Sequence, residues 1–233
     1  MEHKSGCLIC GSELVYENTS SEHKCFYCGE IFNSNNVCSK GHFICDTCHS
    51  SGAMDLIEKY TINTNLTDPV KIANYLMKNR AVKMHGPEHH FLVPAVLLSA
   101  YYNTIGKIEG KGVDIKTARK RGEKVPGGFC GFNGACGAGI GTGIFVSILT
   151  KATPVTSESW KLSNLATSRA LEAIAHCGGP RCCKRDTFLA LFTAQDYVKE
   201  HLDISIDIDR NVTCEFSQMN KECLYEECTF FKK

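Results

Sequence analysis

The sequence predicts a mainly α protein with a small zinc-binding module at its N-terminus, residues 1–52. An all-α helical body with a cysteine-rich tail, residues 53–233, follows it. Two observations lead to this prediction. Seven cysteines lie before residue 50, none between 49 and 129, and eight from 130 onward. From Asp55 onward, apolar residues recur at helical spacing and no βαβ rhythm is visible.

Composition limits the class of protein. The chain has 233 residues, 43% of them hydrophobic, which is enough for one core and a small satellite domain. With 26 basic and 25 acidic residues it lacks the basic field of a nucleic-acid binder, so no nucleic-acid partner is expected. The opening "MEHKSGCLIC" has no apolar signal region, and "FLVPAVLLSAYY" is too short to span a bilayer. We expect a cytoplasmic protein without a membrane partner.

Cysteine usage is high, at 15 residues. Many of these cysteines form CxxC pairs, a histidine lies among them, and no export signal is visible. In a reducing compartment such clusters bind metals rather than form disulfides. The division of the cysteines between the two ends of the chain predicts two different kinds of metal centre.

The first fifty residues contain "CLICG", "CFYCG" and "CSKGHFICDTC". A structural zinc ion takes four cysteine or histidine ligands in a tetrahedron. Eight such ligands within 42 positions therefore predict two zinc ions. They are Cys7, Cys10, Cys25, Cys28, Cys38, His42, Cys45 and Cys48.

Two pairings of these ligands are open. A sequential one places Cys7, Cys10, Cys25 and Cys28 on one ion. A cross-braced one places Cys7, Cys10, Cys38 and His42 on one ion and Cys25, Cys28, Cys45 and Cys48 on the other. The cross-brace is favoured, because the last four ligands lie within eleven residues and would be crowded around one ion. With all positions filled by protein, zinc stabilises a segment too small for its own core. The alternative that the module also provides a docking surface for a partner protein is left open.

Six segments of the body predict secondary structure. "TDPVKIANYLMKN" predicts a helix with Thr67 or Asp68 as N-cap and Pro69 in its first turn. "GPEHHFLVPAVLLSAYYNTIG" predicts a helix from Pro87 to Gly106, and "DIKTARKRGEK" a short polar helix. "SWKLSNLATSRALEAIAHCGG" and "DTFLALFTAQDYVKEHL" predict two long helices, the second capped by Asp186. "DISIDID" alternates and predicts a single edge strand.

The segment "ACGAGIGTGIFVSILTK" predicts a buried helix that is unusually rich in glycine. Each glycine costs about 1 kcal/mol relative to alanine inside an exposed helix. Their number makes sense if neighbouring helices approach closely or if backbone amides face a ligand. No phosphate-loop motif is present.

Three segments together resemble the α-domain of the iron–sulfur L-serine dehydratases, over about residues 85–200: "GPEHHFLVPAVLLSAYYN", "GGFCGFNGACGAGIGTGIF" and "AIAHCGGPRCCKRDTFLAL". The resemblance implies a [4Fe-4S] cluster on three cysteines, with the fourth iron open to substrate. By position these cysteines are Cys130, Cys177 and either Cys182 or Cys183. The chain departs from that family in a shorter gap between the last two ligands, and in carrying His85, Glu88, His89 and His90 in the substrate loop.

By its overall layout, the chain is also identified as a member of an uncharacterised prokaryotic family of unknown function (DUF5714-like). Membership of that family implies no activity. Cysteines beside glycine turns and helix N-termini are expected to have lowered pKa values and amides available to sulfide. For Cys136, and for one of Cys182 and Cys183, a small buried apolar role is an equal alternative.

"HGPEHH" opens a predicted helix. His85, Glu88 and His89 are spaced to share one face, where a general base beside a Lewis-acidic iron would suit elimination. His90 completes the set of catalytic candidates. There are two alternatives to this catalytic role. These side chains could bind a second metal ion, or they could simply lie at a solvated helix terminus.

The tail carries Cys214, Cys223 and Cys228. These three thiols could close a metal site with a fourth ligand from the body, or hold the open cluster themselves. Three basic residues beside the paired cysteines are either solvated or bind a substrate carboxylate; they are Arg181, Lys184 and Arg185.

The leading hypothesis is an iron–sulfur-dependent lyase, a dehydratase or a desulfidase or sulfur-transfer enzyme, acting on a small hydroxy- or thiol-bearing carboxylate. The alternative is a non-enzymatic metal-binding adaptor or iron–sulfur sensor that docks a partner through its zinc module. A homodimer is left open. The geometric expectation is that Cys130 lies near Cys177 and near at least one of His85, Glu88, His89 and His90.

Overall fold

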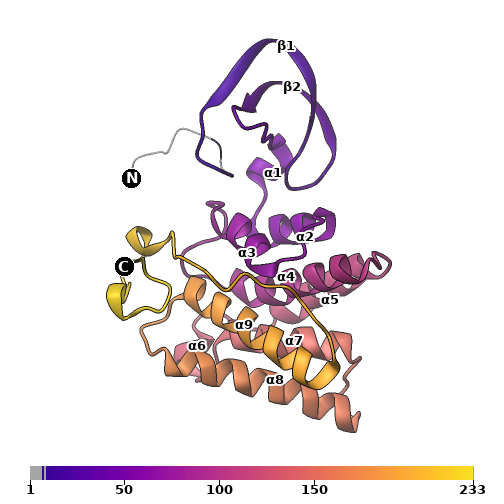
Figure 1. Ribbon diagram of the computed structural model, residues 1–233, viewed down its shortest axis with the longest axis vertical. Coiled ribbons are helices and arrows are strands. Elements are labelled where there is room, and N and C mark those ends of the chain that lie inside the picture. The colour runs from indigo at the N-terminus through magenta and orange to yellow at the C-terminus, as the bar shows by residue number, and fades with distance from the viewer. Residues whose placement is uncertain (1–6, 8, 233) are drawn as a thin grey trace.

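The protein is mainly helical, as the sequence predicts (Figure 1). The structure is a computed structural model that describes Cys7 and residues 9–232, so residues 1–6 and 8 of the predicted N-terminal module lie outside it. The N-terminal module stands at one end of the molecule and the helices pack beneath it. The elements are β1 Leu14–Lys24, β2 Ile31–Cys38, α1 Asp46–Ser50, α2 Ala53–Asn63, α3 Pro69–Met77, α4 Glu88–Ile105, α5 Lys111–Gly122, α6 Phe129–Phe132, α7 Gly137–Leu149, α8 Ser157–His176, α9 Cys183–Leu202, η1 Ser217–Met219 and η2 Tyr225–Glu227.

The N-terminal module is built on an antiparallel hairpin of β1 and β2, which the sequence analysis did not anticipate. Leu14 pairs with Cys38 at one end and Lys24 with Ile31 at the other. Almost every side chain of β1 is exposed, and a lone two-stranded hairpin is marginally stable in water. The interior of the module is instead made largely of its cysteines, which are mostly buried.

Aromatic side chains join the module to the body. The ring of Phe26 stacks on that of Tyr60 in α2, with centroids 5.2 Å apart. Tyr27 is fully buried, and its hydroxyl accepts a hydrogen bond of 3.0 Å from the side-chain amide of Asn79. Both aromatic residues lie between Cys25 and Cys28, so the turn that carries two thiols also holds the module on the body.

Helix α4 runs through the centre of the body, and its first thirteen residues are buried. A helix that is apolar on all sides must be surrounded by other elements. Helices α5 and α7 pack most extensively against it, and α7 packs in turn on α8 and α9. The first turns of α4, α7 and α9 carry many of the chemically active side chains.

The sequence correctly predicted the start of α3 and the end of α4. Asp68 caps α3 through its Oδ1, which accepts from the amide of Val70 at 2.9 Å, and α4 ends at Gly106 in the left-handed conformation. The predicted cap at Asp186 is wrong, because α9 begins three residues earlier, at Cys183. Asp186 lies within its first turn and is buried.

The predicted edge strand at 203–209 is also wrong. Among the described residues no strand pairs with this segment. Ile206 is buried, and its carbonyl accepts from the side-chain amide of Gln195 at 2.7 Å. The amide of Asp209 donates to Asp68. Side chains of the helical body, rather than a neighbouring strand, make these hydrogen bonds with the backbone of the segment. The alternating pattern therefore marks an extended segment with one buried side that is not part of a sheet.

The close approach predicted for the glycines of α7 is confirmed. A methyl group on Gly141 would lie 2.9 Å from Cδ of Pro94 in α4. A methyl group on Gly143 would lie 3.0 Å from the carbonyl oxygen of Ser163 in α8 and would overlap Thr167. The glycines therefore let two helices pack directly on the α7 backbone, and they draw the starts of α4 and α7 together.

The tail returns along α9 to the start of that helix (Figure 1). Phe230 packs on the rings of Phe188 and Phe192, and the amide of Cys214 donates to the carbonyl of Phe230 at 2.7 Å. An ion pair of 2.9 Å joins Glu215 to Lys78. The tail thus places its cysteines beside those at the start of α9.

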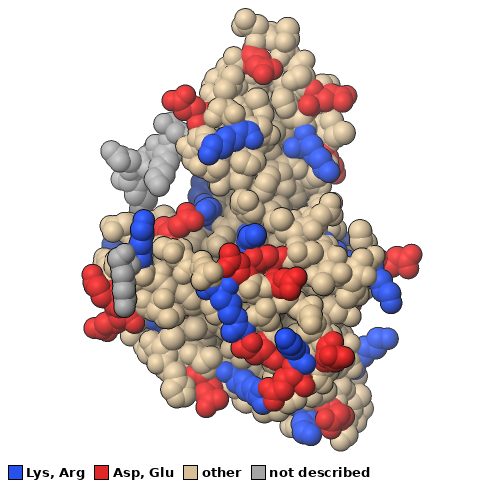
Figure 2. Space-filling view, in the orientation of Figure 1, with Lys and Arg blue, Asp and Glu red and all other residues tan. Residues whose placement is uncertain are grey.

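Charges of both signs are interspersed over the visible face of the module and the body (Figure 2). In the part of the chain that the structure describes, no helix combines the length and apolar character needed to cross a bilayer.

Candidate metal centres

The eight ligands of the N-terminal module form two groups in the cross-braced order. Within each group all ligand atoms lie within 4.8 Å of one another. Three pairs of atoms illustrate the spacing: Cys7 Sγ and His42 Nδ1 at 3.8 Å, Cys10 Sγ and Cys38 Sγ at 3.5 Å, and Cys28 Sγ and Cys45 Sγ at 3.9 Å. One group is Cys7, Cys10, Cys38 and His42, and the other is Cys25, Cys28, Cys45 and Cys48. Each could hold a metal ion.

Backbone amides point at several of these sulfurs. The amide of Ile9 donates to Cys7 Sγ at 3.4 Å and that of Lys40 to Cys38 Sγ at 3.3 Å. In both cases the donor lies two residues after the cysteine. Such hydrogen bonds stabilise a thiolate and orient it as a ligand. We refer to this arrangement as the i+2 amide bond.

The closely spaced thiols of the module need a cation beside them if they are to ionise together. Burial raises the pKa of Cys7 to about 11, and also raises that of Cys28 to about 11. A hydrogen bond from Ser12 lowers the pKa of Cys10 to about 6. Thiols this close cannot all ionise next to one another without a compensating positive charge. Metal binding supplies that charge as it displaces the protons.

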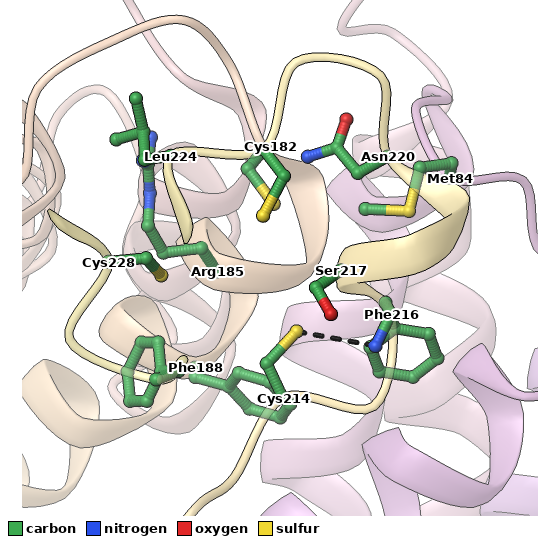
Figure 3. A pocket seen from close by; sticks show the side chains of 12 residues that line it. Met84, Cys182, Arg185, Phe188, Cys214, Phe216, Ser217, Asn220, Leu224 and Cys228 are labelled. Carbon is green, nitrogen blue, oxygen red and sulfur yellow. Dashed lines mark hydrogen bonds between the residues drawn. The ribbon is translucent and has the colours of Figure 1, made fainter. Parts of the chain in front are cut away.

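A second group of thiols lines a cavity between α9 and the tail (Figure 3). Cys182 comes from the N-cap of α9, and Cys214, Cys223 and Cys228 come from the tail. The sulfurs of Cys182 and Cys214 turn toward each other across the cavity. The rest of the lining is mostly apolar, with Met84, Phe188, Phe216, Leu224 and Phe230 among its residues.

The i+2 amide bond recurs at two of the tail cysteines. The amide of Phe216 donates to Cys214 Sγ at 3.3 Å, and the amide of Tyr225 donates to Cys223 Sγ at 3.4 Å. The tail therefore repeats the local geometry that surrounds Cys7 and Cys38. This repetition distinguishes these thiols from cysteines that are buried merely as small apolar residues.

The predicted set of Cys130, Cys177 and one of the paired cysteines is divided between two places. Neither Cys130 nor Cys177 is among the described residues that line the cavity. Cys177 lies within electrostatic reach of Cys228 and Arg185. Cys130 lies within electrostatic reach of Cys183, and the nearby amide of Gly86 acts to lower the pKa of the Cys183 thiol. The loop before α4 thus lies close to Cys183.

Burial sets the protonation of the body thiols. It raises the pKa of Cys182 to about 11, and raises that of Cys136 to about 12 with the nearby Asp186 adding to the effect. Burial also raises the pKa of Cys177, Cys183 and Cys214. The expectation that helix starts would lower these values is therefore wrong. Desolvation of the thiolate outweighs the amides that point at it.

The four catalytic candidates lie together but differ in what they contact. His85 precedes α4, and its Nε2 lies 3.0 Å from Asn220 Oδ1 and 3.2 Å from Glu222 Oε2. Glu88 is buried and accepts from the amide of Lys83 at 2.7 Å, so it closes the loop before α4.

The two remaining histidines share one orientation. His89 and His90 each place Nδ1 near a backbone carbonyl, that of Gly86 at 3.1 Å and that of Val125 at 2.9 Å. In this tautomer each presents Nε2 as an acceptor. Nε2 of His89 is buried with no hydrogen-bond partner among the described residues. Burial lowers the pKa of His89 well below its usual value, and lowers that of His90, so both rings are uncharged.

The basic residues beside the paired cysteines have structural partners. The Lys184 ammonium is buried and donates to the carbonyl of Lys83 at 2.9 Å and to those of Met77 and Val82. Arg185 donates to the carbonyl of Gly178 and pairs with Asp186 at 3.2 Å. Only Arg181 of the three is exposed.

Sequence reasoning missed two residues of these sites. Asp186 accepts a hydrogen bond from Cys136 Sγ at 3.6 Å, and Asn220 lines the thiol cavity. Asp186 was interpreted as a helix cap, and its position between paired cysteines and an apolar helix was the available signal. Asn220 lies between two tail cysteines, in a segment without periodicity, and nothing in the sequence pointed to it.

Comparison with known proteins identifies one family. The model of a family of unknown function, DUF5714, matches residues 57–231, which are 175 of the 233 residues. No curated protein and no solved structure matches the chain. These comparisons do not show the likeness to the iron–sulfur L-serine dehydratases. They do show the family, because its model covers the helical body and the whole cysteine-bearing part of the tail: the chain belongs to the DUF5714 family.

Proposed function

We propose that this chain is an iron–sulfur sensor whose body holds a [4Fe-4S] cluster on Cys182, Cys214, Cys223 and Cys228. The observation that carries the proposal is the convergence of these four thiols on one cavity. One comes from the start of α9 and three from a tail that is far away in sequence. Four thiolates are the ligand set that [4Fe-4S] clusters take.

The spacing of the thiols favours a cluster over a single ion. In a tetrahedral zinc site with Zn–S bonds of about 2.3 Å, the sulfurs lie about 3.8 Å apart. Among the described residues, only the two N-terminal groups bring three or more ligand atoms within 4.8 Å of one another. The four cavity thiols are not among these groups, which agrees with ligands that each bind a different iron.

A fully ligated cluster in an apolar cavity suits a redox or oxygen sensor better than a catalyst. Four protein ligands leave no iron free for substrate. Arg210 binds the first part of the tail to Gln195 of α9, but from Cys214 onward the described tail residues make few polar contacts with the body, among them the ion pair of Glu215 with Lys78 and the contact of His85 with Asn220. A cluster that bridges α9 and the tail therefore controls whether the tail stays docked on the body. Loss of the cluster releases the tail, which a partner protein can then bind.

The N-terminal module takes two zinc ions in this proposal. Its sets of three cysteines with one histidine, and of four cysteines, are typical structural zinc ligands. With all positions filled by protein, zinc serves to fold the module, and the exposed hairpin of β1 and β2 supplies the surface on which a partner protein docks.

Metal analysis after anaerobic purification tests the cluster. We expect about four irons and four sulfides per chain, as the [4Fe-4S] stoichiometry requires, together with a broad sulfur-to-iron charge-transfer absorption. C182S, C214S, C223S and C228S should each lose most of the iron. C177S is the matched control, because Cys177 neighbours Cys228 without lining the cavity. Retention of iron in C214S and C223S would overturn the proposal, and so would zinc in place of iron in the wild-type body.

A second candidate function is the iron–sulfur-dependent lyase, acting on a small hydroxy- or thiol-bearing carboxylate. The observation that favours it is His89, an uncharged imidazole whose unpartnered Nε2 is buried among the described residues, within electrostatic reach of Lys184. An uncharged imidazole is able to accept the α-proton of a substrate. This function requires a cluster on three cysteines with one iron free.

The response to substrate-like compounds separates the two functions. A cluster with four protein ligands leaves no iron free, so small hydroxycarboxylates such as L-serine or L-malate should leave the electron paramagnetic resonance of the reduced wild type unchanged. A cluster held by three cysteines has one open iron, and these compounds should perturb its signal. A wild-type spectrum that responds to such compounds favours the lyase over the sensor.

A further inference from the structure

One charged side chain, that of Arg185, lies among the described residues that line the thiol cavity. Arg185 is in the first turn of α9 and is only 4% exposed. Figure 3 shows it on the side of the cavity that carries Leu224 and Cys228. The remaining lining is apolar or uncharged, and a buried charge is screened much less than one at the surface. Its charge therefore acts on whatever the cavity holds.

The guanidinium of Arg185 also holds the turn that carries Cys182. Its Nη2 donates to the carbonyl of Gly178 at 2.7 Å and to that of Pro180 at 3.2 Å. Both carbonyls belong to the connection between α8 and α9, which ends at Cys182, the N-cap of α9. The planar fork of an arginine fixes such a turn at two points. Burial raises the pKa of Cys182 to about 11, and the charge of Arg185 opposes this rise.

The carboxylate that pairs with Arg185 lies outside the cavity. Nε of Arg185 donates to Oδ1 of Asp186 at 3.2 Å, and Oδ2 of Asp186 accepts from Cys136 Sγ at 3.6 Å. Asp186 is buried but is not among the described residues that line the cavity. The ion pair therefore presents its positive member to the cavity.

A second buried cation lies behind one wall of the cavity. The Lys184 ammonium is 5.2 Å from the ring centroid of Phe216, which lines the cavity. Its hydrogen-bond acceptors are backbone carbonyls, such as that of Lys83 at 2.9 Å. Burying a charge is costly unless an opposite charge accompanies it. These surroundings favour an anionic occupant, and a cluster with four thiolate ligands carries a net negative charge.

We propose that Arg185 is a positioning residue that raises the reduction potential of the cluster, an inference that rests on the function proposed above. Reduction adds one electron, supplied by a one-electron donor such as dithionite, and so adds one negative charge to the cluster. A buried positive charge stabilises the reduced form more than the oxidised form. Net charge, hydrogen bonding and solvent exposure set the potentials of such clusters. Arg185 thus links the position of Cys182 to the potential at which the sensor responds.

Redox titration of the anaerobically purified full chain tests this inference. Dithionite reduces the cluster stepwise in the presence of mediator dyes, and electron paramagnetic resonance measures the reduced fraction. At the wild-type midpoint we expect the ratio of oxidised to reduced cluster to be about tenfold higher in R185Q, a fall in potential of about 59 mV for a one-electron couple. R185K keeps the charge but loses the fork, so its potential should fall less.

A variant of the partner carboxylate should act in the opposite direction. D186N removes the negative charge that compensates Arg185 but keeps an oxygen that accepts from its Nε, so the potential should rise above that of the wild type. R181Q is the matched control, because Arg181 precedes Cys182 directly but is exposed. Solvent and salt screen an exposed charge, so R181Q should keep the wild-type potential.

Iron analysis and circular dichroism of each protein separate this inference from the function on which it rests. Absence of a cluster from the wild type would overturn both. A cluster that is present in R185Q and has the potential of R181Q would overturn the inference alone. If R185Q is folded but binds no iron, D186N decides, and an unshifted potential there would overturn the inference. Loss of iron from R185Q, R185K and D186N alike would also overturn it, because the ion pair would then serve only to assemble the site.

Discussion

The side chains of His85 and Asn220 meet at 3.0 Å and join the loop before α4 to the tail. Asn220 is only 4% exposed and lines the thiol cavity. Its Oδ1 also accepts from the amide of Glu222 at 3.1 Å. This contact therefore joins the histidine-rich start of α4 to the segment that carries the three tail cysteines.

Replacing His85 with alanine should loosen the tail. A buried polar group that loses its partner costs about 1–3 kcal/mol. From Cys214 onward the described tail residues have few other polar contacts with the body. We expect backbone amides of residues 214–231 to exchange hydrogen several-fold faster in H85A, measured by mass spectrometry. H176A removes an exposed histidine and should leave the exchange unchanged. Unchanged exchange in H85A would mean that the other contacts of the tail, such as the packing of Phe230 and the ion pair of Glu215 with Lys78, hold it without His85.

Local signals explain why some elements could be predicted. The cap of α3 depends on Asp68, Pro69 and Val70, which are adjacent in sequence, and their chemistry is sufficient to start a helix. The end of α4 depends on Gly106 alone. The eight N-terminal ligands could be recognised because metal geometry imposes their short spacing. In each case the information lies within a few neighbouring residues.

Tertiary contacts explain the failures. The start of α9 at Cys183 is set by burial of the first turn against the body, which overrides the capping preference of Asp186. The extended segment around Ile206 has a buried side but no strand to pair with. The association of Cys182 with the tail joins residues more than thirty positions apart, and tertiary contacts such as the packing of Phe230 on α9 bring them together.

The cross-braced pairing of the N-terminal ligands predicts an unequal response of two double variants. C7S/C38S alters two ligands of one group, whereas C7S/C25S alters one ligand in each. The first should lose about one zinc ion per chain and the second about two, because a tetrahedral site weakened by one thiolate binds poorly. Elemental analysis after gel filtration gives the zinc content. A sequential pairing reverses the order, since Cys7 and Cys25 would then share an ion.

The glycine at position 143 should be required for the packing of α7 on α8. In G143A the new methyl group meets the carbonyl of Ser163 at 3.0 Å and overlaps Thr167. Overpacking costs about 1–3 kcal/mol, which outweighs the gain of about 1 kcal/mol in helix propensity. We expect a lower midpoint of urea unfolding.

A matched glycine provides the control for that variant. Gly112 lies in α5, and a methyl group there meets only Cδ1 of Ile62, at 3.9 Å. G112A should leave the midpoint unchanged or raise it, because the contact is an ordinary one and alanine favours helix. If G143A is as stable as G112A, helices α7 and α8 are able to separate at little cost.

Lys111 should make the stability of the body depend on pH above neutrality. It is 2% exposed at the start of α5, where its ammonium donates to the carbonyl of Thr64 at 2.9 Å and to Oδ1 of Asn103 at 2.8 Å. Burial lowers its pKa from 10.5 to about 8. The unfolded chain therefore binds this proton more tightly than the folded chain does. Below about pH 8 both states are protonated and the full cost of burying the charge is present. As pH rises from about 8 to 10.5, the folded state loses the proton first and that cost disappears.

Comparison of the wild type with K111M should reveal this effect. The free energy of unfolding of the wild type should rise relative to that of K111M between pH 8 and 10.5, by at most roughly 3 kcal/mol for a difference of this size. Titration of the cysteines is common to both proteins and cancels in the difference. K116M, which removes an exposed lysine from the same helix, controls for the loss of one positive charge. Urea unfolding at four or five pH values gives the measurement. A difference between the wild type and K111M that stays constant over this range would show that Lys111 keeps its proton in the folded protein and that its two hydrogen bonds offset the cost of burial.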